Sequence, residues 1–598
     1  MGVDDQMEVK HEIRIRFQNR VETINCLDGS NLLDLLHQHG YSVYSPCGGK
    51  GRCGKCIVRV RGEAGSLTDP ERRHLTRSQI EDGFRLACQV RASGTFEIDL
   101  SSADQLVILS EGTETPFKPD PRIRQRQIRL EQPSIDKQHD YWHRIRELGF
   151  KAATPRALQR LGTLAQKQDL VVTYSGSRIL DIDELTSGTA SRAAYGIAVD
   201  VGTTTVVLYL LDLTNGFQVG AHAFANPQSR YGADVITRID YTLSRAGGAE
   251  DLKNSLLEAL NQGVRELAGK NGLDPGRIYH AVFAGNTVML HMLLGVNAAS
   301  IANAPYVPIF TDGLEFSADE LGLKIHPDGI VELLPCVSGY VGADIIADLL
   351  VADFESDSWR LLVDIGTNGE IILGNKERVF ACSAAAGPAF EGANITFGMS
   401  GVPGAIAAYR IEDNGEVSWQ TISSQEPRGI CGSGLVDIIA ALYSRGFVSP
   451  SGAFREDAPL EQYQGQRAYR VVPGKEIFLT QKDVREYQLA AGAIAAGIKV
   501  LIGEAGISEA DIDRFYLAGG FGSYINPESA SVLGLIPKSL LAKVVKLGNG
   551  AGAGARQYLL DRGAKARADE LKQKITYVEL SARKDFQKHF MEAMLFPE

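Results

Sequence analysis

The sequence is short of cysteines and of long apolar runs, and each shortage excludes a class of protein. Eight cysteines among 598 residues are too few for a secreted disulfide scaffold. The segment Met1–Gln6 has neither the basic start nor the apolar stretch of a secretory signal. The most apolar segment, Leu489–Ile502, is short and contains Lys499, which predicts a buried helix rather than a membrane span. We therefore expect a cytoplasmic protein without a membrane partner.

Basic residues are also fewer than acidic ones. The chain has 62 Lys and Arg against 73 Asp and Glu, which gives a formal net charge of −11. This charge argues against nucleic acid as the main partner. An apolar content of 44% and a charged content of 23% are ordinary for a folded protein, and the length predicts several domains.

Four of the cysteines gather on and just beyond a glycine-rich stretch near the N-terminus. Five residues separate Cys47 from Cys53, two separate Cys53 from Cys56, and Cys88 follows an expected strand and helix. Glycines allow the positive φ that a loop needs to fold around an inorganic core, and an iron–sulfur cluster needs four converging thiolates. The pattern therefore favours these four cysteines as cluster ligands.

This spacing resembles that of the [2Fe–2S] ferredoxins, in the vertebrate and bacterial branch, over residues 8–100. The expected order of strand, strand, helix, cysteine loop and strand agrees with the β-grasp fold of that family. Structural zinc is the alternative, since four cysteines also suit zinc. Zinc sites usually pair two Cys-x-x-Cys units, and neither Cys47 nor Cys88 has such a partner, so we favour the [2Fe–2S] cluster.

Two segments of different character follow the ferredoxin-like region. Residues 101–125 lose periodicity and contain Pro116, Pro119 and Pro121, so we interpret them as a linker. An ordered loop over the ferredoxin surface is the alternative. Residues 126–190 mix expected strands and amphipathic helices, which predicts a small α+β middle domain.

One motif occurs twice in residues 193–598. An apolar strand leads to Asp200 and Gly202, and a second apolar strand leads to Asp364 and Gly366; a further strand follows each motif. Each repeat therefore predicts a hairpin whose turn carries aspartate, glycine and threonine.

A second pair of segments repeats in the same order. Residues 272–285 and 506–519 have glycines at both ends and an isoleucine at the same step, each before an apolar strand. Such self-similarity predicts a duplicated α/β domain, with halves at about 193–345 and 358–598.

The duplicated hairpins and a late Gly-Gly turn resemble the acetate and sugar kinase, Hsp70 and actin superfamily, whose ATPase domain consists of two ribonuclease-H-like halves. Hairpin turns of this kind present backbone N–H groups and threonine hydroxyls to phosphate, and the aspartates can hold Mg²⁺ through water. The glycine turn would let adenosine lie flat, and an apolar helix beginning at Gly432 could bind an anion at its N-terminus. We expect Asp200 and Asp364 to be catalytic. The expected ATP contacts are Gly202, Thr203, Thr204, Thr205, Gly366, Thr367, Asn368, Gly432, Ser433, Gly519 and Gly520.

An iron–sulfur carrier joined to an ATPase resembles the reductive activators of corrinoid proteins over nearly the whole chain. The resemblance implies ATP-dependent reduction of cob(II)amide to cob(I)amide in a methyltransferase system. It also implies a corrinoid protein partner, an external low-potential electron donor and a homodimer. Related activators of methylamine systems bind [4Fe–4S] clusters near the C-terminus, whereas no cysteine follows Cys431 here, so only the [2Fe–2S] branch fits.

Other functions fit less well. A ferredoxin-fused small-molecule kinase would need a catalytic base, and none is identifiable. A redox-regulated chaperone would need a peptide-binding β-domain, and nothing after Asp364 has that pattern. An ATP-dependent activator of another low-potential enzyme stays open, although activators of radical dehydratases share one [4Fe–4S] centre in a dimer. No Gly-x-Gly-x-x-Gly opens a βαβ unit, which argues against a flavin-linked reductase.

Overall fold

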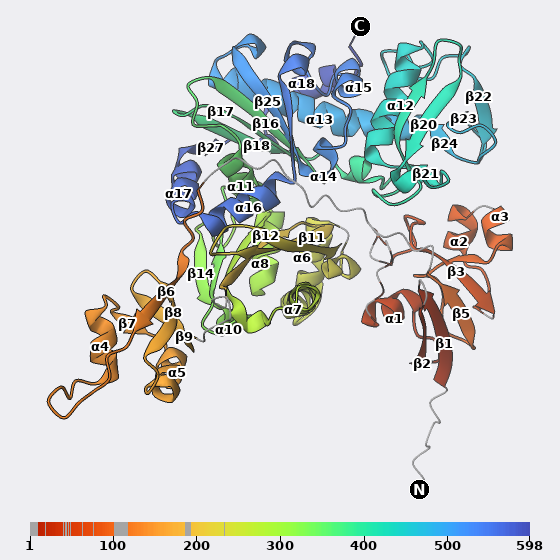
Figure 1. Ribbon diagram of the computed structural model, residues 1–598. Helices are drawn as coiled ribbons and strands as arrows, with labels where there is room; N and C mark the ends of the chain where they lie inside the picture. The colour runs from red at the N-terminus through yellow and green to blue at the C-terminus, as the bar shows by residue number, and fades with distance from the viewer. Residues whose placement is uncertain are drawn as a thin grey trace.

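Figure 1 shows the computed structural model, in which a ferredoxin-like domain and a small α+β unit flank a large two-part body. The structure describes residues 10–17, 20–39, 41, 43, 45, 47, 49–62, 64–75, 77–100, 118–185, 193–232, 234–366 and 368–597. Most of the predicted linker, residues 101–117, and the predicted ATP contact Thr367 lie outside the described residues.

The ferredoxin-like domain is a five-stranded sheet in the order β2-β1-β5-β3-β4. Alternation along β1 buries Ile13 and Ile15 completely, and they share one core with Leu32 and Leu36 of α1. This sheet confirms the β-grasp expectation. Its elements are β1 (Lys10–Phe17), β2 (Arg20–Leu27), α1 (Leu32–Gln38), β3 (Ile57–Gly62), α2 (Asp69–His74), α3 (Arg77–Glu81), β4 (Phe84–Leu86) and β5 (Phe96–Asp99).

The small α+β unit is a four-stranded sheet in the order β6-β8-β9-β7, with α4 and α5 packed on it. It projects from the body as an arm (Figure 1). Its elements are β6 (Ile123–Arg129), α4 (Tyr141–Glu147), β7 (Ala152–Ala153), α5 (Pro155–Leu164), β8 (Asp169–Ser175) and β9 (Arg178–Glu184).

The end of the predicted linker is ordered, which corrects its boundary. Asp120 forms backbone hydrogen bonds with Leu560 and Arg562 in the C-terminal half, at 2.8 and 3.0 Å. The strand β6 then begins at Ile123, two residues before the predicted end of the linker. Pro119 and Pro121 have no backbone N–H, but Asp120 between them does. The segment can therefore still pair through its backbone.

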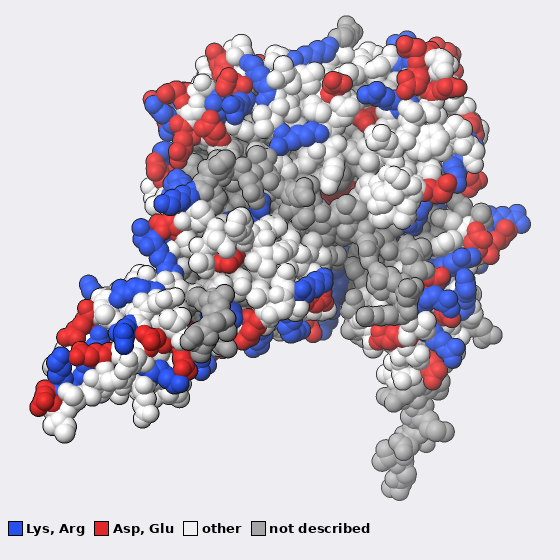
Figure 2. Space-filling view, viewed as in Figure 1, with Lys and Arg blue, Asp and Glu red and all other residues white. Residues whose placement is uncertain are grey.

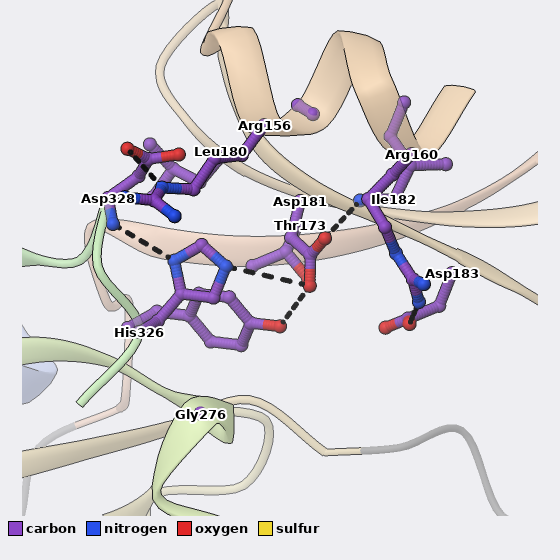
Figure 3. Close-up of polar contacts among 12 residues, drawn as sticks. Arg156, Arg160, Thr173, Leu180, Asp181, Ile182, Asp183, Gly276, His326 and Asp328 are labelled. Carbon is purple, nitrogen blue, oxygen red and sulfur yellow. Dashed lines mark hydrogen bonds and ion pairs between the residues drawn. The ribbon is translucent and has the colours of Figure 1, made fainter. Parts of the chain in front are cut away.

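Ion pairs and hydrogen bonds join the arm to the body (Figure 3). Asp181 on β9 accepts a hydrogen bond from the Tyr279 hydroxyl at 2.8 Å. Arg277 of the body pairs with Asp183 of β9, and Arg156 of α5 pairs with Asp328 across the same interface. The arm is therefore attached at both its entry strand and its β9 edge. On the face drawn in Figure 2, basic and acidic side chains are interspersed over the arm.

The body consists of two similar halves, which confirms the duplicated ATPase-type fold. The sheet of the first half has the order β12-β11-β10-β13-β15-β14, and that of the second has the order β26-β25-β16-β17-β18-β27. Each half contains an antiparallel hairpin (β10–β11, β16–β17), a long helix (α7, α13) and a strand parallel to the first hairpin strand (β13, β25).

The element bounds of the two halves are as follows. The first has β10 (Tyr195–Val201), β11 (Thr205–Asp212), β12 (Gln218–Ala225), α6 (Val235–Ser244), α7 (Gly248–Lys270), β13 (Ile278–Gly285), α8 (Thr287–Leu294), α9 (Ala299–Ala302), β14 (Leu314–Ser317), α10 (Ala318–Leu321), β15 (Ile330–Leu333) and α11 (Ala343–Val351). The second has β16 (Trp359–Ile365), β17 (Gly369–Gly374), β18 (Val379–Ala384), α13 (Gln481–Ala505), β25 (Ile512–Ala518), α14 (Gly519–Gly522), α15 (Pro527–Val532), β26 (Val544–Gly548), α16 (Gly550–Leu560), α17 (Ala564–Lys574), β27 (Ile575–Tyr577) and α18 (Lys584–Ala593).

An insertion between β18 and α13 forms two small three-stranded sheets beside α12. Its elements are β19 (Ala405–Ile411), β20 (Val417–Thr421), β21 (Gly429–Ile430), α12 (Gly432–Ser444), β22 (Leu460–Tyr463), β23 (Gln466–Arg470) and β24 (Phe478–Thr480). Among the described residues, α13 is the one helix long and apolar enough to cross a membrane, and 67% of its most apolar window is buried inside the protein. It packs against β17, β18 and α18, as the sequence predicts for a core helix.

Helices α11 and α16 cross where the two halves meet, and small residues allow the close approach. A Cβ at Gly554 would lie 1.9 Å from the carbonyl oxygen of Ala347. The helix α16 belongs by sequence to the second half, yet it packs against β10 and β13 of the first. The crossing therefore ties the halves together at a joint without bulky side chains.

We predict that Gly554→Ala destabilises the protein by about 1–3 kcal/mol, because the added methyl group meets backbone that cannot move aside. The matched control is Gly503→Ala in α13, where a Cβ meets no described atom within 4 Å. Thermal unfolding of both variants tests this. Equal midpoints would show that the helix crossing is looser than the structure indicates.

Candidate functional site

The four N-terminal cysteines come together as free thiols at one end of the β-grasp domain. Cys56 and Cys88 are buried, and Cys47 and Cys53 are partly exposed. The Cys53 thiol donates to the Cys47 sulfur at 3.3 Å. The other four cysteines of the chain are all buried.

Glycine geometry forms the loop around these thiols. Gly49, Gly51 and Gly54 have φ of 77°, 68° and 66°, which confirms that the loop uses the left-handed region. At Gly54 a Cβ would also lie 2.6 Å from the Cβ of His74. The Gln89 amide donates to the Cys88 sulfur at 3.4 Å, a contact of the kind that tunes a bound cluster.

The thiols interact as two pairs. The hydrogen bond from Cys53 lowers the pKa of Cys47 to about 5, and the one from Cys56 lowers the pKa of Cys88 to about 7. The same hydrogen bonds, together with burial, raise the pKa values of the donors Cys53 and Cys56. This sulfur-only donor set, held on a glycine loop, fits an iron–sulfur cluster.

The second site is a group of carboxylates where the two halves meet. Asp200 and Asp364 lie at the matching ends of β10 and β16, as predicted. Three further carboxylates interact with them: Asp344 and Asp348 on α11, and Glu370, which is paired with Asp364 across the second hairpin. These three were missed by the sequence interpretation, although the four-residue spacing of Asp344 and Asp348 places both on one helix face.

Burial and mutual repulsion raise the pKa values of these carboxylates. Burial raises the pKa of Asp200 to about 6, and burial with the charge of Asp200 raises the pKa of Asp344 to about 7. Burial and the charges of Asp344 and Asp200 raise the pKa of Asp364 to about 7. The pKa values of Asp348 and Glu370 are raised for the same two reasons. Carboxylate oxygens are the ligand type that Mg²⁺ takes, and the charged forms of these five groups are disfavoured where they lie.

Asn549 connects the carboxylates to the end of the chain. Its side-chain N–H donates to Asp200 Oδ2 at 2.9 Å. Its side-chain oxygen Oδ1 accepts from the backbone N–H of Gly552 at 2.6 Å and so caps α16. Asn549 was assigned no role from the sequence. The contact is visible only once α16 packs on the first half.

The first predicted phosphate turn is firmly held. Asn226 donates to the carbonyl oxygen of Gly202 at 2.8 Å, and Asn286 donates to the Thr203 hydroxyl at 2.9 Å. Arg238, completely buried, donates to the carbonyl oxygen of Thr203 at 2.6 Å. These three bonds hold the turn by its carbonyl oxygens and by the Thr203 hydroxyl. In the second turn, Gly366 donates to the carbonyl oxygen of Asn368 at 2.9 Å.

The late glycine turn lies directly beside the second aspartate. Gly519 has φ of 83°, and a Cβ there would lie 2.0 Å from Asp364 Oδ1. The parallel pairing of β25 with β16 places Ala518 opposite Asp364 and causes this approach. A Cβ on the neighbouring Gly520 would meet no described atom within 4 Å.

Gly432 does begin the apolar helix α12, as predicted. A Cβ on it would lie 2.1 Å from the carbonyl oxygen of Phe390 and 2.2 Å from the ring of Phe521. The hydroxyl of Ser433 is turned inward and donates to the carbonyl oxygen of Ala407 at 2.9 Å. Its side chain is therefore committed to the inserted sheet, and only its backbone N–H is left for a nucleotide.

Comparison with known proteins accounts for both sites. Profiles described as the 2Fe-2S iron-sulfur cluster binding domain, the RACo middle region, and the C-terminal domain of RACo, the ASKHA domain, match residues 16–93, 195–357 and 358–598. The corrinoid activation enzyme RamQ of Eubacterium limosum is 33% identical over 609 residues, covering 98% of this chain and 99% of the relative. The chain belongs to the family of corrinoid activation enzymes.

Other family relatives agree. A solved structure described as a reductive activator for corrinoid, iron-sulfur protein aligns with a TM-score of 0.74 at 30% identity, covering 98% of each chain. The [Co(II) methylated amine-specific corrinoid protein] reductase of Methanosarcina barkeri is 28% identical over 405 residues, covering 64% of this chain and 73% of the relative. The family, with its 2Fe-2S and ASKHA domains, carries a [2Fe–2S] cluster and binds ATP. The resemblance seen in the sequence is confirmed.

The thiol geometry generates a prediction for the cluster. The holoprotein should contain about two irons per chain, and Cys88→Ser should lose most of this iron because it removes one of four ligands. Iron analysis and visible absorption after anaerobic purification measure this. Cys431→Ser, a buried cysteine of the C-terminal half, is the matched control and should keep the spectrum. Zinc in place of iron would contradict the assignment.

The turn beside Asp364 generates a second prediction. Gly519→Ala should weaken ATP binding by at least about tenfold, because a methyl group displaces Asp364 and the positive φ is strained. Gly503→Ala adds the same methyl group in α13, where a Cβ meets no described atom within 4 Å, and should bind ATP normally. Calorimetric titration with Mg-ATP compares them. Equal affinities would remove this turn from the nucleotide site.

Proposed function

We propose that this protein is an ATP-dependent reductase that returns a corrinoid protein from cob(II)amide to cob(I)amide and so supports a methyltransferase system. The observation that carries the proposal is the presence, in one chain of this family, of a four-thiol site and a group of carboxylates at the junction of duplicated halves. Neither a plain ferredoxin nor a plain kinase needs both.

ATP is needed because of the energetics of the reaction. Plant-type [2Fe–2S] centres have potentials near about −400 mV, and cobalt(II) in a corrinoid is harder to reduce than that. Each ~100 mV of such a one-electron gap corresponds to about 2.3 kcal/mol. Nucleotide binding can supply this only if ATP prefers one conformation or one complex over another.

The residues of this chain have separable roles in the proposed reaction. Cys47, Cys53, Cys56 and Cys88 hold the [2Fe–2S] cluster, which supplies one-electron transfer when bound. Asp200 and Asp364, with Asp344 nearby, hold the Mg²⁺ that accompanies ATP. Because their pKa values are about 6 to 7, cation binding releases protons, and metal-dependent nucleotide binding weakens as the pH falls through this range.

The backbone groups of both hairpin turns contact the phosphates. We further propose that the protein receives electrons from an external low-potential donor, works in the cytoplasm and forms a homodimer. These proposals rest on the family resemblance and on the charge and composition of the chain.

The alternative function is phosphorylation of a small molecule at the same junction. The structure brings five carboxylates together there, and any of them could in principle act as a base. The kinase alternative gives the N-terminal thiol site no role, so the reductase function accounts for more of the chain.

The two functions differ in what stimulates ATP hydrolysis. A methyltransferase corrinoid protein in the cob(II)amide state should stimulate hydrolysis, whereas sugars and carboxylic acids should not. With a strong chemical reductant, Mg-ATP should raise the yield of cob(I)amide, followed by its absorption. Asp364→Asn should lower the ATP-dependent rate by at least about tenfold and leave the iron content unchanged.

A cob(I)amide yield that is independent of ATP would contradict the proposal. Phosphorylation of a hydroxyl or carboxylate compound by the purified protein would support the kinase instead. The variant Cys88→Ser separates the two functions further, because it should abolish cobalt reduction while a kinase would keep its phosphoryl transfer.

A further inference from the structure

The ferredoxin domain contacts the C-terminal half through a side chain of its cluster loop. Lys55 lies between the ligands Cys53 and Cys56 in sequence. Its Nζ donates hydrogen bonds to the carbonyl oxygens of Ile395, at 3.0 Å, and of Gly398, at 2.6 Å. Figure 1 shows this domain beside the inserted sheets of the C-terminal half. The contact joins segments more than 300 positions apart in the chain.

Loop 395–398, which accepts the hydrogen bonds of Lys55, is held by contacts within the C-terminal half. Thr396 donates from its backbone N–H and from its hydroxyl to Asp483 Oδ1, at 2.7 and 3.0 Å. Asp483 is completely buried, and with Thr480 it caps the start of α13. Two fixed carbonyl oxygens with a carboxylate behind them form a site suited to an ammonium group, which has three donors and no acceptor.

The residue Phe390, a few positions before this loop, connects it with the carboxylates at the junction of the halves. Phe390, just before the loop, packs on Phe521 with ring centroids 6.5 Å apart, and the absent side chain of Gly432 makes room for both. Phe521 follows the turn at Gly519, which touches Asp364. A continuous series of contacts therefore runs from these carboxylates to the loop that accepts Lys55.

We propose that Lys55 docks the ferredoxin domain on loop 395–398 of its own chain and that ATP bound at the junction of the halves weakens this docking. The docked arrangement covers the Lys55 side of the cluster loop, so a corrinoid protein and loop 395–398 compete for that face. Release by nucleotide is the part that rests on the proposed function, because ATP can favour delivery only by preferring one arrangement.

The docking is tested on the full-length, cluster-containing protein by small-angle X-ray scattering. Lys55→Met removes the donors while keeping an unbranched side chain, and it should increase the radius of gyration. Lys55→Arg still offers N–H donors to both carbonyl groups and should remain close to wild type. Lys50→Met, an exposed lysine on the same loop, is the matched control and should also resemble wild type. Iron content and visible absorption must be unchanged in all three variants.

Mg-ATP tests the nucleotide part. It should increase the radius of gyration of the wild type and cause no further increase in Lys55→Met. An unchanged radius in Lys55→Met, or an equal increase in Lys50→Met, would overturn the docking. An unchanged wild-type radius on adding Mg-ATP would overturn the release. Neither result depends on a corrinoid partner, so the cobalt-reduction assay still judges the proposed function separately.

Discussion

Repulsion among carboxylates gathered at the junction of the two halves is the interaction on which the rest of the structure depends. Asp200 and Asp364 come from matching strands, and Asp344 and Asp348 come from the helix that leads from one half to the other. Burial, and after it the charges of their neighbours, raise the pKa values of Asp344 and Asp364, so gathering these groups without a cation is costly. The fold holds them in place by the hairpins, the α11–α16 crossing and the cap formed by Asn549.

The same junction connects nucleotide chemistry with the position of other parts of the chain. Gly519 lies against Asp364, and Phe521 follows it two residues later in the chain. Phe521 packs on Phe390, which precedes in sequence the loop that accepts Lys55. These contacts are between packed rings and backbone, so a small shift at the junction cannot be absorbed by a flexible surface side chain. Coupling across the molecule therefore needs no large rearrangement of either sheet.

Local patterns in the sequence predicted the parts of the site that lie close together in the chain. The spacing of Cys47, Cys53 and Cys56 indicated a cluster loop, and the repeated aspartate–glycine–threonine motif indicated two hairpins, because each is encoded within a few residues. Asp348 and Asn549 could not be assigned in this way. Their roles arise from the crossing of α11 and α16, whose sequences are about two hundred positions apart. The sequence of a helix rich in small residues does not indicate which other helix it packs against. The backbone pairing of Asp120 could not be foreseen for the same reason, since its partner Asp561 lies in the C-terminal half, far along the chain.

The pairing of Asp120 with the segment at Leu560 has a consequence for how far the cluster can travel. It fixes one end of the tether at residue 118, while the ferredoxin sheet ends at Asp99. A fully extended chain covers at most about 3.3–3.6 Å per residue, so the intervening segment sets an outer radius of roughly 60–70 Å around that anchor. The cluster can lie beyond this radius only by the size of the ferredoxin domain, and this confinement keeps the local concentration of the donor high for an acceptor that binds the same chain.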